Sequence, residues 1–269
     1  MPELPEVQTV VNTLEPQIKN KKLLSYTTHW KRVNYSKNSS LLNATIKNQA
    51  INSISRKGKY IIIKTNKYFI IFHLRMTGYL YYSKKLIKNK YIRCYFSFTD
   101  STYLIYEDIR KFGGFYYLKD LTIIDDKLGI DALDDSLTYS WLKTNLKNKK
   151  RQIKGLLLDQ SFIAGLGNIY IDEVLWLSQI HPLTISNKIK LKNIKLLTEN
   201  IKSVLYKSIK HHGTTIINFK FDNMRTGEYR NKLNVYGRNG EECNYCKNII
   251  DKAVISGRGT YYCKTCQRY

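Results

Sequence analysis

The sequence predicts an α+β protein, with a mostly β N-terminal part, a helical part after it and a small cysteine-containing finger at the C-terminal end. Short runs rich in Ile, Tyr, Phe and Thr recur from about Leu23 to Leu118, separated by Gly or Asn, which is typical of an antiparallel sandwich or barrel. From Asp134 onward the hydrophobic period changes to that of helices. Two Cys-x-x-Cys pairs complete the pattern.

The first expected element is an N-terminal helix. Pro5 suits the first turn of a helix, and apolar residues then recur at helical spacing as far as Ile18. The expected strands cover residues 51–56, 60–65, 68–74, 91–98, 102–106 and 115–118. The expected helices of the second part cover residues 137–146, 151–159, 168–179 and 188–209, and Ser136 is a plausible cap for the first of them.

An acidic stretch at residues 125–135 contrasts with its basic surroundings and is interpreted as the linker between the two parts. Residues 211–236 have weak periodicity and several Gly, Asn and Arg, which favours a long functional loop. We therefore expect three domains, at residues 1–133, 134–235 and 236–269.

The charge of the chain indicates a polyanionic partner. The 269 residues include 45 Lys and Arg against 21 Asp and Glu, a net charge of +24 with a pI near 9.7. The other interpretation is a compositional bias toward the residues of AT-rich codons, which enriches lysine without any ligand. No apolar run approaches the ~20 residues of a spanning helix, and the acidic start does not resemble a secretory signal. An intracellular nucleic-acid-binding protein is expected.

The cysteines predict a metal centre. Cys243 and Cys246 form one pair, Cys263 and Cys266 form another, and sixteen residues separate the pairs. This spacing is typical of a four-thiolate zinc site, in which two tight turns supply two ligands each. A closed site of this kind has no open position for a substrate, so we expect one structural Zn²⁺. Cys94 lies in a strand pattern and is expected to be a buried thiol.

The first six residues suggest a nucleophile. Removal of Met1 would leave Pro2 as a terminal secondary amine, close to the carboxylates of Glu3 and Glu6. A terminal amine titrates near ~8 and a lysine near ~10.4, so far more of the terminal amine is unprotonated at neutral pH. The alternative is that proline and acids simply begin a helix, where both are favoured.

Six motifs follow one another along the chain: the Pro-Glu-Leu-Pro-Glu-Val start and the motifs at residues 56–60, 73–78, 108–113, 165–170 and 262–267. In this order they resemble the formamidopyrimidine-DNA glycosylase family of bacterial enzymes, which remove oxidised purines from DNA. The resemblance runs along nearly the whole chain. It implies an N-terminal catalytic β-sandwich domain with flanking helices, a helix-two-turns-helix DNA-binding domain, and a terminal β-hairpin zinc finger.

The resemblance also implies catalytic roles. Pro2 would attack the anomeric carbon and hold the opened sugar as an iminium, with Glu3 as general acid/base and Glu6 polarising its neighbours. Lys59 would deliver a proton during β-elimination, although a surface lysine is the plain alternative. Arg258, between two glycines of the finger, resembles the arginine that the family links to δ-elimination and a phosphate contact.

The implied DNA contacts follow from the need to extrude a damaged base and fill the gap. Met76, Arg110 and Phe112 are the candidate wedge, since they lie in polar, glycine-flanked loops rather than in core patterns. The loop after Thr214-Thr215 corresponds to the region that closes over the lesion. The other expected DNA contacts are Tyr91, Lys150, Arg151, Lys154 and Asn168, with Lys149 adding charge.

The chain departs from the family pattern in places. A histidine often found near Tyr91 is absent, and Ile109 and Lys111 replace a proline and an arginine of the wedge motif. Two alternatives remain open: an oxidised-pyrimidine glycosylase of the endonuclease VIII type, and a non-catalytic zinc-finger DNA-binding protein. Double-stranded DNA with oxidised bases is the expected partner, and a cytoplasmic, nucleoid-associated monomer is expected.

Overall fold

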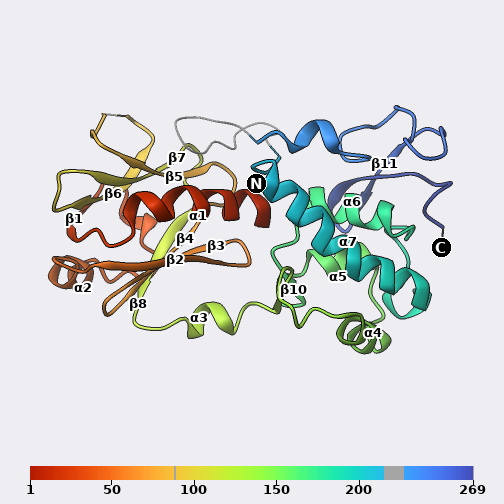
Figure 1. The fold of residues 1–269 in the computed structure, drawn as a ribbon, viewed down its shortest axis with the longest axis horizontal. Coiled ribbons are helices and arrows are strands. Elements are labelled where there is room, and N and C mark those ends of the chain that lie inside the picture. The colour runs from red at the N-terminus through yellow and green to blue at the C-terminus, as the bar shows by residue number, and fades with distance from the viewer. Residues whose placement is uncertain (88, 215–226, 269) are drawn as a thin grey trace. The chain divides into compact units, whose positions relative to one another are not determined.

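The computed structural model describes residues 1–87, 89–214 and 227–268. The chain divides into two compact units, each formed from two stretches of sequence (Figure 1). The first contains Met1–Asp126 and His211–Glu228, and the second contains Lys127–Lys210 and Tyr229–Tyr269. The lesion loop expected after Thr214 occupies residues 215–226, outside the described residues.

Two four-stranded sheets form the first unit, with strand orders β1-β6-β7-β5 and β2-β3-β4-β8. Every neighbouring pair within them is antiparallel, so the sandwich of the sequence prediction is confirmed and the barrel is not. The strands are β1 Leu23–Thr28, β2 Ile51–Lys57, β3 Tyr60–Thr65, β4 Phe69–His73, β5 Gly78–Ser83, β6 Ile92–Phe98, β7 Tyr103–Asp108 and β8 Gly114–Leu118.

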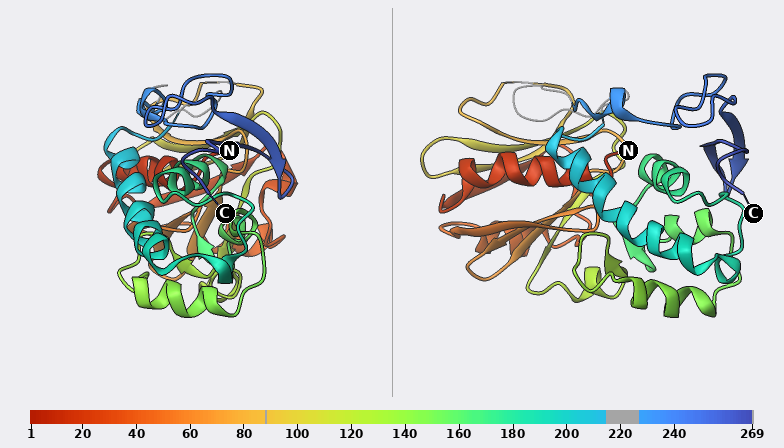
Figure 2. Two further views of the ribbon diagram at one scale, coloured as in Figure 1. Left: turned by 90° about the vertical axis from the view of Figure 1, so that its right-hand side faces the viewer. Right: turned by 45° about the vertical axis from the view of Figure 1, so that its right-hand side comes forward.

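Helix α1 (Leu4–Ile18) runs between the two sheets (Figures 1 and 2) and packs against β2, β3 and β5. Its apolar side, which includes Val7, Val10 and Leu14, is buried in the same core cluster as the inward residues of both sheets. Because that core fixes the helix, it also fixes the N-terminal residues that begin it. The smaller helices of the unit are η1 Lys31–Val33, α2 Ser39–Thr45 and α3 Thr122–Asp125.

The predicted strands and helices did not include β1, β5 or α2. Gly78 was interpreted as a separator between strands, but it begins β5, where a Cβ would lie 2.3 Å from the Leu74 carbonyl oxygen. The glycine is therefore required by the close approach of two backbones and does not mark a break. Helix α2 is only seven residues long and buries only Leu42, which leaves too little periodicity to detect.

The second unit is mainly helical, as predicted. Its longest helix is α7 (Leu191–Lys210), which begins three residues later than the predicted helix at 188–209, and the 3-10 turn η2 (Ser186–Lys188) precedes it. Among the described residues, none of the helices is both long and apolar enough to cross a membrane. The other elements are β9 Ile130–Asp131, α4 Tyr139–Lys147, α5 Ile153–Leu158, β10 Ile163–Ala164, α6 Asn168–Leu177, η3 Tyr229–Lys232, β11 Asp251–Ile255 and β12 Arg258–Tyr262.

Candidate active site, DNA contacts and metal centre

The N-terminal residues are held together by the start of α1. Glu3 is the N-cap; its backbone N–H donates to Glu6 Oε2 at 2.8 Å, and its side chain accepts from the Glu6 backbone N–H. This capping box satisfies two groups that a helix end otherwise leaves without partners. Glu3 and Glu6 are 4% and 1% exposed, and Pro2 is also buried. The structure thus brings the three predicted residues together.

Glu6 also reaches the residues that precede the lesion loop. The Thr214 N–H donates to Glu6 Oε1 at 2.7 Å, so both carboxylate oxygens accept hydrogen bonds from backbone amides. Gly213 has φ +82°, and a Cβ there would lie 2.7 Å from Glu6 Oε1, so glycine is required on both counts. These contacts suit Glu6 to positioning rather than to proton transfer.

Lys59 follows Gly58, which has φ +56° in the turn between β2 and β3. The side chain is 6% exposed, so Lys59 is not the solvated surface lysine of the alternative interpretation. The neighbouring His73 packs edge-on against Tyr60, and its Nδ1 accepts the Arg75 N–H at 3.1 Å. Burial, with the charges of Arg75 and Lys59, lowers the pKa of His73 to about 3, so this imidazole is neutral at physiological pH.

A pocket of about 640 Å³ lies at the N-terminus of the chain, within the first unit. Two wedge candidates border it, and both are exposed: Met76 at 40% and Phe112 at 53%. The Arg110 guanidinium lies 4.5 Å from the centroid of the Phe112 ring. These residues are therefore not part of the core, as the polar, glycine-flanked sequence around them predicted. The pocket is lined by Met1, Tyr35, Arg75, Met76, Lys111, Phe112 and Tyr116.

Asp108 organises the loop at residues 109–113, which carries the wedge candidates Arg110 and Phe112 and is called the wedge loop below. Its sequence motif did not indicate this role. Asp108 is fully buried, and its Oδ2 accepts the backbone N–H groups of Phe112 and Gly113, each at 2.8 Å. Its Oδ1 accepts the Arg110 N–H at 3.1 Å and the Thr77 hydroxyl. One carboxylate thus connects the loop that carries Arg110 and Phe112 with the loop after Met76.

We expect Asp108→Asn to disorder the wedge loop. An amide nitrogen in place of Oδ2 would face two backbone donors and leave them without an acceptor, at a cost of about 1–3 kcal/mol. Lesion-duplex affinity and the free energy of unfolding should both fall. Asp100→Asn, at an exposed turn of the same unit, is the control, and equal effects of the two variants would contradict the role given to Asp108.

The predicted DNA contacts Tyr91, Lys150 and Arg151 are accessible to different degrees. Tyr91 is half-buried, and its carbonyl accepts the Asp108 N–H at 3.0 Å. Lys150 and Arg151 are exposed, and Arg151 pairs with Asp159 at 2.7 Å. That Lys150 and Arg151 contact DNA phosphates remains a prediction.

Asn168 connects the helical elements to the finger. It begins α6, and its Nδ2 donates to the Gly259 carbonyl at 2.8 Å. Ser256 and Gly257 both have positive φ, as a tight β-hairpin turn requires, and Arg258 is the exposed residue that follows them. Asn168 thereby fixes the strand that carries Arg258. Its own Oδ1 is buried and has no hydrogen-bond partner within the described part of the chain.

Lys154 requires a correction. It was expected to contact DNA, but its side chain is fully buried and its Nζ lies 2.5 Å from Asp172 Oδ1. Asp172 Oδ2 also accepts the Tyr261 N–H at 2.9 Å, and burial raises the pKa of this carboxyl to about 7 although Lys154 opposes the rise. The lysine therefore connects α5, α6 and β12 instead of facing a phosphate. Sequence position alone could not separate it from its exposed neighbours.

We expect Lys154→Met to destabilise the second unit by about 3–5 kcal/mol, because it leaves Asp172 buried without its cation. The double variant Lys154→Met with Asp172→Leu should recover most of that loss. Lys150→Met is the exposed control and should stay within about 0.5 kcal/mol of the parent. Urea unfolding measures all three. A Lys154→Met protein of unchanged stability but weakened DNA binding would restore the original interpretation.

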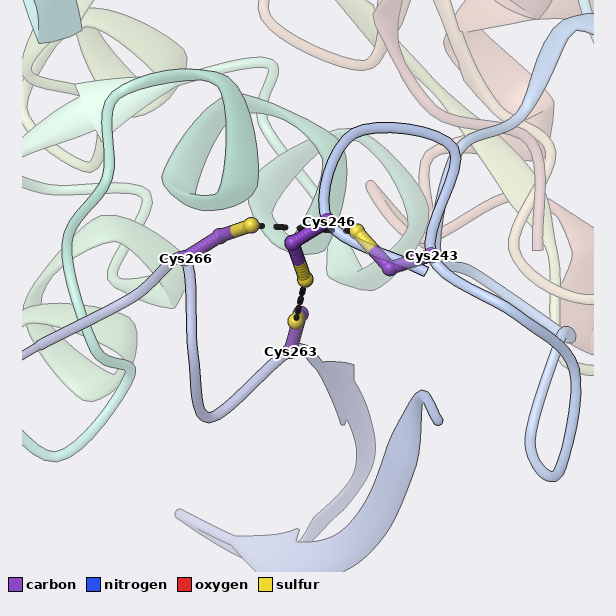
Figure 3. Close-up of side chains that lie close together, drawn as sticks. All are labelled: Cys243, Cys246, Cys263 and Cys266. Carbon is purple, nitrogen blue, oxygen red and sulfur yellow. Dashed lines mark hydrogen bonds between the residues drawn. The ribbon is translucent and has the colours of Figure 1, made fainter. Parts of the chain in front are cut away.

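The four predicted cysteines converge on one point (Figure 3), with all four Sγ atoms within 4.8 Å of one another. The Cys243–Cys266 and Cys246–Cys263 sulfur pairs are 3.8 and 3.4 Å apart. Thiolates bound tetrahedrally to Zn²⁺ at about 2.3 Å would lie about 3.8 Å apart, so the donor set fits a zinc ion. The Asn248 N–H, above all, lowers the pKa of Cys246 to about 6, whereas burial raises the pKa of Cys263 and of Cys266. Cys94 is fully buried in β6, as expected.

The first unit is a β-sandwich that buries Pro2 and Glu3 beside exposed loops with the wedge candidates. The second unit is helical and ends in a four-cysteine finger. Together these features define a base-excision DNA glycosylase. Family models agree along the chain. The formamidopyrimidine-DNA glycosylase N-terminal domain matches residues 1–115, its H2TH domain matches 128–220, and the zinc finger found in FPG and IleRS matches 240–268.

Full-length relatives give the same result. The chain is 38% identical to a formamidopyrimidine-DNA glycosylase of Protochlamydia amoebophila, with 100% of both chains covered, and 40% identical to one of Lactobacillus acidophilus, with 99% covered. A solved Lactococcus lactis FPG mutant in complex with Fapy-dG containing DNA aligns over 100% of both chains, with a TM-score of 0.92 and 35% identity. The chain belongs to the formamidopyrimidine-DNA glycosylase family, whose members are glycosylases and abasic-site lyases.

Proposed function

We propose that the chain excises oxidised purines, namely 8-oxoguanine and formamidopyrimidines, from double-stranded DNA and then cleaves the strand at the abasic site. The observation that carries the proposal is the buried cluster of Pro2, Glu3 and Glu6 beside the pocket that Met76 and Phe112 border. Solved relatives support the substrate class, since one is in complex with Fapy-dG containing DNA and another, MutM, with carbocyclic 8-oxo-G containing DNA.

In the proposed reaction the Pro2 nitrogen attacks C1′ of the extruded nucleotide, and the glycosidic bond breaks as the base leaves with a proton. Glu3 takes the proton that the Pro2 nitrogen loses and donates it to the ring oxygen O4′, so the sugar ring opens and leaves an iminium at C1′. Loss of a C2′ proton then expels the 3′-phosphate, and Lys59 supplies a proton during this β-elimination. A second elimination releases the 5′-phosphate, with Arg258 neutralising the leaving group, and water finally frees Pro2.

The proposed DNA contacts serve to extrude the damaged nucleotide and to bind the DNA backbone. Met76 and Phe112 would fill the space that the extruded nucleotide leaves, and Arg110 would pair with the orphaned cytosine. Lys150, Arg151, Asn168 and Tyr91 would contact the backbone, where a protein of net charge +24 gains affinity that falls with salt. We retain as proposals the three domains at residues 1–133, 134–235 and 236–269, and a cytoplasmic, nucleoid-associated location.

Borohydride trapping tests the proposal. The protein is incubated with a duplex that carries 8-oxoguanine opposite cytosine, reduced, digested and mapped by mass spectrometry. We expect the reduced adduct on Pro2. An adduct on another residue would overturn the nucleophile.

A matched duplex with an oxidised pyrimidine tests the second candidate function, because one solved Lactococcus lactis relative is in complex with an oxidised pyrimidine containing DNA. Faster trapping on that duplex than on 8-oxoguanine would move the substrate class to the pyrimidines. Absence of trapping on both, with Met1 shown to be removed, would leave a non-catalytic DNA-binding protein.

A further inference from the structure

A second pocket, of about 490 Å³, lies within the second unit, and none of the residues assigned to catalysis or DNA contact lines it. One wall is formed by η2 and the first turn of α7. The opposite wall is formed by the two cysteine turns, with Cys246 and Cys266 among its residues. The proposed reaction gives this pocket no role.

The charge of the pocket is of one sign. Lys188, Lys190, Lys192 and Arg268 line it and are exposed, whereas none of its lining residues is acidic. The Arg268 Nε donates only a long hydrogen bond, 3.4 Å, to the Thr265 carbonyl. Within the described ranges the three lysines have no ion-pair partner. Four cations around one cavity without a carboxylate favour an anionic ligand.

Two further features point to a ligand. Thr184 lines the pocket and is 7% exposed, and its buried Oγ1 has no hydrogen-bond partner among the described residues. Such a hydroxyl is costly to leave unsatisfied, and an acceptor such as a phosphate oxygen would remove the cost. In addition, α7 begins at Leu191 in this wall, and the N-terminus of a 20-residue helix favours an anion.

The ring of Tyr245 gives the pocket an aromatic rim, since this side chain is 78% exposed. Cations beside an accessible aromatic ring are the combination that binds nucleotides, through the phosphate and through stacking on the base. We propose that this pocket binds the phosphate of a nucleotide, with Lys188, Lys190, Lys192, Arg268 and Thr184 as donors and Tyr245 as the stacking surface. The nucleotide is either a free mononucleotide or part of a nucleic-acid strand.

A competing explanation comes from the metal centre. Four thiolates around a zinc dication carry net negative charge, and nearby cations could serve only to balance it. The two explanations differ in their consequences. Countercharges would affect zinc retention and not phosphate binding, whereas a nucleotide site would affect phosphate binding at constant zinc content.

The test follows the backbone amides of residues 190–193 and 265–268 by NMR in the zinc-loaded protein. A local signal is needed because other parts of so basic a protein also bind phosphate. The probes are inorganic phosphate, thymidine 5′-monophosphate and a short thymidine oligomer. The variant Lys188→Gln/Lys192→Gln is compared with Lys195→Gln/Lys207→Gln, which removes the same charge from exposed positions of α7 that do not line the pocket.

We expect saturable shifts at these amides in the parent and the control, and a Kd raised by about tenfold or more in the pocket variant. Tyr245→Ala should weaken the monophosphate and leave inorganic phosphate unchanged. Preference for the monophosphate identifies a free nucleotide. Tighter oligomer binding, with a salt slope that falls by about one to two in the pocket variant, identifies a strand.

Three outcomes overturn the proposal. The first is that none of the probes shifts these amides in the parent. The second is that both double variants weaken binding equally, which would show a diffuse effect of net charge. The third is that the pocket variant loses zinc while phosphate affinity is unchanged, which would assign the cations to the metal centre.

Discussion

Pro2→Gly is expected to lower the rate of strand cleavage by about 100-fold or more while leaving the affinity for lesion DNA nearly unchanged. The variant keeps a terminal amine after removal of Met1, but it loses the ring that makes this amine secondary and holds its nitrogen beside Glu3. A displacement of about 1 Å of a reacting atom is enough for a loss of this size. Single-turnover cleavage of an 8-oxoguanine duplex and equilibrium binding without turnover measure the two quantities.

Pro16→Ala is the matched control, because Pro16 lies near the far end of α1, the helix that follows Pro2, and is exposed. It should cleave at the parent rate. A Pro2→Gly protein that nicks DNA as fast as the parent would show that the ring of Pro2 has no part in the chemistry. Loss of DNA binding together with cleavage would instead indicate that Pro2 serves only the structure of the segment before α1.

The sequence predicted the clustering of the N-terminal candidates, because that clustering depends on a short motif. Pro2, Glu3 and Glu6 are adjacent along the chain, so the helix that begins at Leu4 brings them together without any distant contact. The cysteine pairs have the same advantage within each turn. Even so, the contact of Glu6 with Thr214 joins residues 208 positions apart, and no local pattern could have shown it.

Charged residues were predicted less well, because exposure and burial look alike in a sequence. Lys150, Arg151 and Lys154 stand within five positions, yet the first two face solvent and the third is fully buried against Asp172. Asp108 likewise belongs to a motif that was identified, but its role depends on backbone amides that fold toward it from the following turn. A buried carboxylate between two exposed loops is a tertiary property.

The second large effect is expected for Cys243→Ser. Cys243 is fully buried in a small cluster with Val235, Ile250 and Cys263, and this cluster has little apolar surface to hold the finger without a metal. Structural zinc contributes about 10–16 kcal/mol to the folding of zinc-finger peptides, so the loss of one of four ligands removes much of what holds β11 and β12.

We therefore expect Cys243→Ser to lose zinc, to exchange the amide hydrogens of residues 240–268 rapidly, and to bind DNA more weakly than the parent. The sandwich unit should keep its protection, because α1 and both sheets form a separate core. Cys94→Ser is the matched control: it removes a buried thiol of the first unit and should retain zinc. A Cys243→Ser protein that keeps its zinc, its protection and its DNA affinity would show that the four sulfurs converge without serving the fold. Weakened binding with the finger still protected would place the effect of Cys243 at the DNA surface, so the two measurements together separate a structural metal from a direct contact.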